Sequence, residues 1–191
     1  MDNKARAFVY AFLSRMFEKE LGHKEIKDLR SNPELLETIG KEAKEYMLQE
    51  DVAKIEEELN IDFNSLFVIN SQPVESLVVD STGEILVGLQ NPVMFFYFEN
   101  GYELDMNKTE ILAPDHLSIE FAFMQNLAYR SETKQAQKFL KEHLLLWVVP
   151  YLVAMRKQAQ TPFYKDLCDF TNDFLLHEYE TLKQEHTLDR V

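Results

Sequence analysis

The side chains best suited to take part in chemistry lie together in one short segment, Pro114–Glu120. Asp115 and His116 are adjacent in it, and Glu120 follows four residues after His116. If Asp115 begins a helix, His116 and Glu120 lie on one face and can pair, while Asp115 stays at the positive end of the helix dipole. This pattern is typical of a capped helix with a surface ion pair. A functional acid–base pair in a cleft between two lobes is the alternative.

Other catalytic and cofactor motifs are missing from the sequence. It has no GxGxxG or GxxxxGK[ST] phosphate loop, no HExxH, CxxC or EF-hand metal motif, and no GxSxG nucleophile turn. The single Glu-x-x-His, from Glu20 to His23, contains a glycine that disrupts it as a helical di-iron motif. His143 and Trp147, four residues apart, are more typical of packing than of ligand binding. We therefore expect no catalytic residue, no metal and no cofactor.

Composition indicates a globular, helix-rich protein. The 191 residues are 46% hydrophobic and 28% charged, with only 5 glycines and 6 prolines. This length suits one domain, divided at most into two lobes. The net charge of −13 disfavours nucleic acid and anionic membrane surfaces as partners, whereas it suits a basic peptide or protein.

Location is indicated by three further features of the sequence. The N-terminus has neither the basic nor the apolar region of a secretory signal. The longest apolar stretch, Leu144 to Met155, is interrupted by Pro150 and is shorter than the ~20 residues that span a bilayer. The only cysteine, Cys168, lies among apolar residues, which predicts a buried, unreactive thiol in a reducing compartment. We expect a soluble, cytoplasmic protein.

Apolar residues recur at helical spacing through most of the chain, and polar residues mark where helices begin. We expect capped helix starts at Ser31-Asn32-Pro33, Asp51, Asn91-Pro92, Asp115, Ser131 and Thr161-Pro162. Pro150 should kink a helix or start a new one. Residues 74–87 break this rhythm, and at face value they predict two short strands joined by a turn, a β-hairpin. The polar stretch 100–114 is the expected linker between lobes.

Five segments in order resemble the TorD-like family (TorD, DmsD and NarJ types), cytoplasmic chaperones that mature molybdenum-cofactor oxidoreductases. Ala113–Met124 is similar to the Pro-Asp-His-Leu…Glu-x-x-Phe-Met signature of that family, and Pro73–Leu77 to its Pro-x-Glu-Ser-Val/Leu segment. Asp62–Phe67 resembles its Tyr/Phe-x-x-Leu-Phe segment. Phe139–Val148 and Thr161–Tyr164 resemble its C-terminal Phe-Leu-x-x-His-Leu-x-x-Trp and Thr-x-Phe-Tyr segments. The likeness covers nearly the whole chain.

The resemblance implies an all-α fold, a single helical domain with lobes at about 1–100 and 115–191 and a hinge at about 101–114. It also implies that 74–87 is loop and short helix rather than a hairpin. Its implied function is to bind the twin-arginine leader and the apo catalytic subunit of a molybdopterin oxidoreductase, assisting cofactor insertion and proofreading before export. A homodimer formed by domain exchange is a further implication. By motif position, the implied partner-binding residues are Asp115, His116, Glu120, Glu75, Leu117 and Phe121.

Two other functions remain open at this point. A helical assembly subunit of a redox complex would share the fold and the acidic surface. An enzyme using Asp115 and His116 as an acid–base pair is the third hypothesis.

Overall fold

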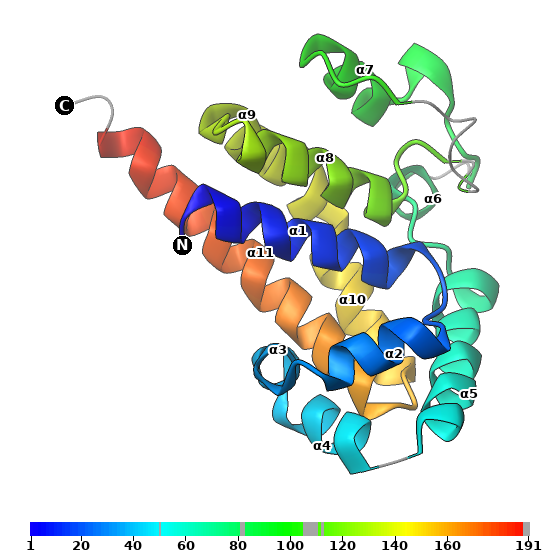
Figure 1. Cartoon of the computed structure of the whole chain (residues 1–191). Coiled ribbons are helices and arrows are strands. Elements are labelled where there is room, and N and C mark those ends of the chain that lie inside the picture. The colour runs from blue at the N-terminus through cyan, green and yellow to red at the C-terminus, as the bar shows by residue number, and fades with distance from the viewer. Residues whose placement is uncertain (50, 81–82, 105–110, 112, 189–191) are drawn as a thin grey trace. The chain divides into compact units, whose positions relative to one another are not determined.

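The structure is a computed structural model that describes residues 1–49, 51–80, 83–104, 111 and 113–188 (Figure 1). Every regular element within those residues is a helix, so the predicted all-α fold class is confirmed. The described residues also contain one isolated antiparallel β-bridge, between Val74 and His116.

The helices are numbered in chain order. The first five are α1 (Asn3–Glu18), α2 (His23–Arg30), α3 (Pro33–Ile39), α4 (Lys41–Gln49) and α5 (Val52–Phe63). The π-helix η1 (Asn64–Asn70), α6 (Glu75–Val79), the 3-10 helix η2 (Gly88–Gln90) and α7 (Pro92–Glu99) follow. The last are α8 (Leu117–Tyr129), α9 (Thr133–Phe139), the π-helix η4 (Leu140–Leu144), α10 (Leu145–Gln158) and α11 (Pro162–Leu188).

The chain divides into two compact units, each built from segments that are distant in sequence. The first unit comprises Met1–Glu18, Pro73–Val149 and Leu175–Val191, and the second comprises Lys19–Gln72 and Pro150–Phe174. The expected continuous lobes, 1–100 and 115–191 with a hinge at 101–114, stay a prediction. Residues 105–110 and 112 of that expected hinge lie outside the described residues.

The core of the first unit is aromatic. Helix α1 packs along α8 (Figure 1), where Tyr10 and Phe17 each lie about 6 Å, ring centre to ring centre, from Phe121. Tyr97 of α7 lies on Phe123 of α8, with 4.7 Å between ring centres. These contacts bury one face of α8 against α1 and connect α8 to α7.

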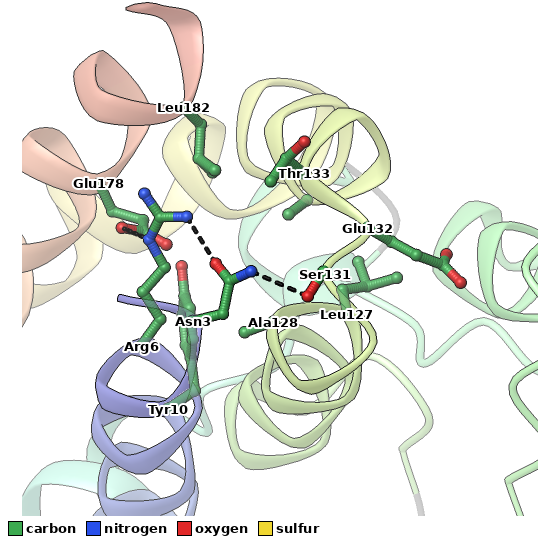
Figure 2. A pocket seen from close by; sticks show the side chains of 11 residues that line it. Asn3, Arg6, Tyr10, Leu127, Ala128, Ser131, Glu132, Thr133, Glu178 and Leu182 are labelled. Carbon is green, nitrogen blue, oxygen red and sulfur yellow. Dashed lines mark hydrogen bonds and ion pairs between the residues drawn. The ribbon is translucent and has the colours of Figure 1, made fainter. Parts of the chain in front are cut away.

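A buried ion pair fastens α1 to α11 within the first unit. Figure 2 shows the Arg6 guanidinium beside Glu178, and both side chains are only 2% exposed. The Nε of Arg6 lies 3.2 Å from Glu178, and its Nη2 donates to Glu185 at 2.6 Å. Asn3 accepts a bond from Arg6 Nη1 and donates one to Ser131, which adds the segment before α9 to the cluster. The first and last helices are thus tied together by named polar contacts.

The second unit contains a break that the helical pattern alone does not predict. The apolar spacing of residues 33–49 continues without interruption, yet α3 ends at Ile39 and α4 begins at Lys41. A Cβ on Gly40 would lie 2.0 Å from the Asp166 carboxylate, so only glycine permits the close approach. That carboxylate accepts a hydrogen bond from the Ala43 N–H at 2.7 Å, which satisfies one free donor in the first turn of α4.

Most of the predicted helix starts are confirmed. Asn32, Asp51 and Asn91 cap α3, α5 and α7 through side-chain acceptors. Thr161 precedes Pro162 at the start of α11, as predicted, and its hydroxyl accepts a weak bond of 3.4 Å from a first-turn N–H. Ser131 was expected to cap a helix, but it has a φ of 60° and the N-cap of α9 is Glu132. Its left-handed backbone is not the extended conformation that an N-cap needs.

The expected hairpin at 74–87 is wrong. Glu75–Val79 form the short helix α6, and the described residues 83–87 contain no strand. The alternative of loop and short helix, implied by the family resemblance, is therefore confirmed for the described part of this segment. At Pro150, helix α10 continues, and the residue coincides with the boundary between the two units.

Candidate functional site

Two motifs that are forty residues apart in sequence lie against each other in the first unit. The backbone oxygen of Asp115 accepts from the Glu75 N–H at 3.0 Å, and the Pro73 oxygen accepts from the Leu117 N–H at 2.8 Å. The Asp115 carboxylate also accepts from the Ser76 N–H at 2.8 Å. These three bonds join the Pro-Asp-His segment to the start of α6.

Asp115 therefore caps α6 rather than α8, and the predicted helix start is corrected by one residue. The N-cap of α8 is His116, whose Nδ1 accepts from the Ser118 N–H at 3.3 Å and lies 2.9 Å from the Ser118 hydroxyl. Burial lowers the pKa of His116 to about 4, so its imidazole is neutral at physiological pH. A neutral imidazole can accept these bonds, whereas an imidazolium could not.

The expected surface pair between His116 and Glu120 does not form. Since His116 is the cap residue, its ring bonds to Ser118 in the first turn of α8 and not to Glu120. Glu120 itself is fully buried, and its Oε2 accepts from the indole N–H of Trp147 at 3.4 Å. Its Oε1 has no partner among the described residues.

The surroundings of Glu120 favour its protonated form. Burial is the largest cause of a pKa raised well above the ordinary value, and the carboxylates of Glu75 and Asp115 raise it further. Burial raises the pKa of the Tyr97 phenol in α7, and the carboxyl groups of Glu120, Asp115 and Glu75 raise it further. The site therefore collects acidic groups closely enough that they influence one another.

Glu75 contacts His143, a residue whose spacing from Trp147 indicated a role in packing. The Nδ1 of His143 lies 3.0 Å from Glu75 Oε1 and 3.2 Å from Oε2. Both side chains are mostly buried, at 8% exposure for His143 and 14% for Glu75. The signal that could have placed His143 and Trp147 in the site was their position in the Phe-Leu-x-x-His-Leu-x-x-Trp segment.

A pocket opens beside this cluster. Its volume is about 400 Å³, and we call it the Asp115 pocket. Among its described lining residues, three carry carboxylates, three supply apolar wall and none is basic. One carboxylate oxygen of Asp115, Oδ1, has no hydrogen-bond partner among the described residues. The lining residues are Glu75, Ser76, Val79, Asp80, Leu86, Asn91, Pro92 and Asp115.

The six residues expected to bind a partner are placed differently by the fold. Glu75 and Asp115 line the pocket, and His116 caps the helix beside it. Leu117 and Phe121 are fully buried, and Phe121 packs against α1. The structure thus brings all six into one region of the first unit, but only Glu75 and Asp115 are on the pocket wall.

The described part of the chain has neither a metal-binding cluster nor a membrane-spanning helix. It contains no group of three or more His, Cys, Asp and Glu side chains arranged to hold a metal ion. None of its helices combines the length and the apolar character that crossing a bilayer requires. Cys168 is buried, as predicted, and burial raises the pKa of its thiol to about 12.

Comparison with known proteins gives a consistent result. The model of the nitrate reductase delta subunit family matches residues 30–152. A chaperone protein TorD from Shewanella piezotolerans is 25% identical over 206 residues, which cover 97% of this chain and 95% of the relative. Chaperone protein TorD from Shewanella pealeana is 25% identical over 205 residues, with 96% and 92% covered. That from Colwellia psychrerythraea is 23% identical over 223 residues, with 95% and 93% covered.

The family match includes both motifs that form the pocket and the segment that contributes His143 and Trp147. The matched residues make up more than half of the chain. The chain belongs to the nitrate reductase delta subunit family, the family of the TorD-like proteins that its motifs resemble.

Proposed function

We propose that this protein is a cytoplasmic maturation chaperone that binds the twin-arginine leader and the apo catalytic subunit of a molybdopterin oxidoreductase. It holds the subunit until the cofactor has been inserted and so prevents premature export. Relatives over nearly the full length are named chaperone protein TorD, which supports this class of function.

The observation that carries the proposal is the chemistry of the Asp115 pocket. Guanidinium groups are planar donors that bind carboxylates, often in pairs of hydrogen bonds. Glu75, Asp80 and Asp115 line the pocket, and no lysine or arginine is among its described lining residues. Val79, Leu86 and Pro92 add the apolar wall that suits the hydrophobic part of a leader. The proposed ligand is thus an arginine pair next to an apolar segment.

The other four predicted residues hold the two pocket residues in position. His116 fixes the start of α8, and buried Leu117 and Phe121 hold that helix in the core. Burial and the carboxylates of Glu75 and Asp115 raise the pKa of Glu120 and so favour its uncharged form. In the proposal, Asp115 and Glu75 contact the leader, and these four residues hold them in position.

Calorimetric titration with leader peptides tests the proposal. The peptides come from formate dehydrogenase, dimethyl sulfoxide and trimethylamine oxide reductases, nitrate reductase and polysulfide reductase. At least one should bind, and replacing its two arginines with glutamine should weaken binding, because the contacts to carboxylates are lost. Failure of every peptide to bind, or binding that ignores the arginines, would overturn the proposal.

The family description favours one second candidate, a lasting subunit of a redox complex. Purification of the protein with a folded, cofactor-loaded oxidoreductase would support a permanent subunit. Release of the protein once the cofactor has been inserted would support the chaperone.

Light scattering in the same experiment measures whether domain-exchanged homodimers form.

The acid–base hypothesis receives no support from the geometry. The carboxylate of Asp115 bonds to the Ser76 N–H, and the ring of His116 bonds to the Ser118 N–H. The two side chains therefore serve different helix starts and do not form a pair that could move a proton between them.

A further inference from the structure

Helix α7 is apolar on every side but is buried on only one. Its sequence, PVMFFYFE, contains a single charged residue. Such a helix is normally buried all round. Phe96 and Tyr97 are buried against Phe123 and Phe139. On the opposite side Phe95 is 46% exposed and Phe98 is 68% exposed.

This exposed side begins at the Asp115 pocket. Pro92, the first residue of α7, lines the pocket, and Pro92, Phe95 and Phe98 follow at intervals of three residues. Residues three apart lie on the same side of a helix, so these three form one stripe about 9 Å long. We call this stripe the α7 face. Asn91 fixes its start, because its side chain caps α7 and donates to the Leu86 oxygen at 3.0 Å.

Charge identifies the occupant of this surface. The pocket end of the stripe is acidic, with Glu75, Asp80 and Asp115 in its wall, while the stripe itself is apolar. A second copy of this chain would bring carboxylates against carboxylates, with a net charge of −13 on each copy. A segment that is basic at one end and apolar along its length matches both parts.

We propose that the α7 face binds the apolar segment that follows the arginine pair of a leader peptide, while the arginines lie in the Asp115 pocket. This inference rests on the proposed function and adds to it a second subsite and a direction. The peptide runs from the N-terminal end of α7, where the arginines lie, toward Glu99 at its C-terminal end.

The test uses two synthetic peptides and the full-length protein. One peptide carries two adjacent arginines followed by a run of leucine and alanine, and the other ends directly after the arginines. The double variant Phe95→Ala/Phe98→Ala should bind the long peptide about tenfold more weakly, because apolar burial is lost. Its affinity for the short peptide should equal that of the wild type.

Phe8→Ala is the matched control, since Phe8 is 60% exposed on α1 and lies outside the pocket. It should bind both peptides like the wild type. Circular dichroism of each variant confirms that the helices are intact. A spin label on the apolar end of the long peptide should broaden the NMR signals of α7 in the wild type. A label on the arginine end should broaden those of α6 instead.

Several results would overturn the inference. Equal binding of the long peptide by the double variant and the wild type would exclude the α7 face, as would broadening of α6 by the label on the apolar end. If the wild type self-associates and the double variant does not, with peptide affinity unchanged, the face is an interface between copies. Absence of binding by both peptides to the wild type would instead overturn the proposed function on which the inference rests.

Discussion

The indole N–H of Trp147 points at the carboxyl group of Glu120, with 3.4 Å between Nε1 and Oε2. Both side chains are buried, and no basic side chain accompanies the carboxyl group in the contacts described for it. A buried carboxyl group without a cation is stable only when it is protonated. The contact therefore links Glu120 of α8 to Trp147 of α10 within the first unit.

The first prediction concerns the pH dependence of stability. The pKa of Glu120 is raised in the folded protein. The contribution of this group to the free energy of unfolding is therefore complete below the unfolded pKa of about 4.3 and is lost as the pH rises through the folded pKa. Glu120→Gln is neutral throughout, so its free energy of unfolding relative to the wild type should increase with pH. Urea unfolding over a pH series measures this. The exposed Glu142→Gln is the control and should show no such trend; a constant difference for Glu120→Gln would contradict the prediction.

A second prediction separates the two carboxyl groups in peptide binding. Asp115→Asn keeps an oxygen that can cap α6 but removes a charge, so leader affinity should fall by about 1–3 kcal/mol. Glu120→Gln should change affinity little, because it replaces a protonated group. Salt should weaken binding by the wild type more than binding by Asp115→Asn. Calorimetry at two salt concentrations decides, and an equal loss in both variants would show that Glu120 is charged in the site.

A third prediction concerns the contact between Glu75 and His143. Both are mostly buried, so removing either partner leaves the other without its hydrogen bond and should cost roughly 1–3 kcal/mol of unfolding free energy. In a double-mutant cycle with Glu75→Gln and His143→Phe, the two losses should not add, with a coupling energy of about 0.5–3 kcal/mol. Additive losses would show that the two side chains do not interact in solution.

A fourth prediction tests the connection between α1 and α11. Arg6→Met leaves Glu178 buried without its cation and should cost about 3–5 kcal/mol. Burial is the main cause of a raised pKa at Glu178, and Arg6 opposes that shift, so the variant should take up a proton there. Replacing both residues by Met should recover much of the stability. Thermal unfolding checks the order, and a double variant less stable than Arg6→Met would contradict it.

The helices and many of their starts could be predicted from the sequence alone. Asn32, Asp51 and Asn91 cap helices because the acceptor and the N–H that it satisfies are two or three residues apart. The apolar residues around Cys168 also predicted its burial. These features depend on neighbours in the chain, which the sequence contains directly.

The wrong hairpin and the break at Gly40, which the helical pattern did not predict, share one physical origin. Residues 74–79 have the β-branched composition of a strand, but 75–79 form a helix whose first N–H groups bond to Asp115, about forty residues away. The break at Gly40 likewise depends on Asp166, more than a hundred residues away. Local propensity is worth only tenths of a kcal/mol per residue, so a buried cap from another segment outweighs it.

The fold class, most helix starts, the acidic charge and the motifs that identify the family follow from the order of residues in the chain. The tertiary structure was needed to show that Asp115 caps α6, that His116 bonds to Ser118 and not to Glu120, and that Glu120 is buried beside Trp147. It also placed His143 against Glu75 and left one side of α7 exposed. Burial and pairing with distant residues set the charge and orientation of a side chain, and these depend on the distances in space that folding creates.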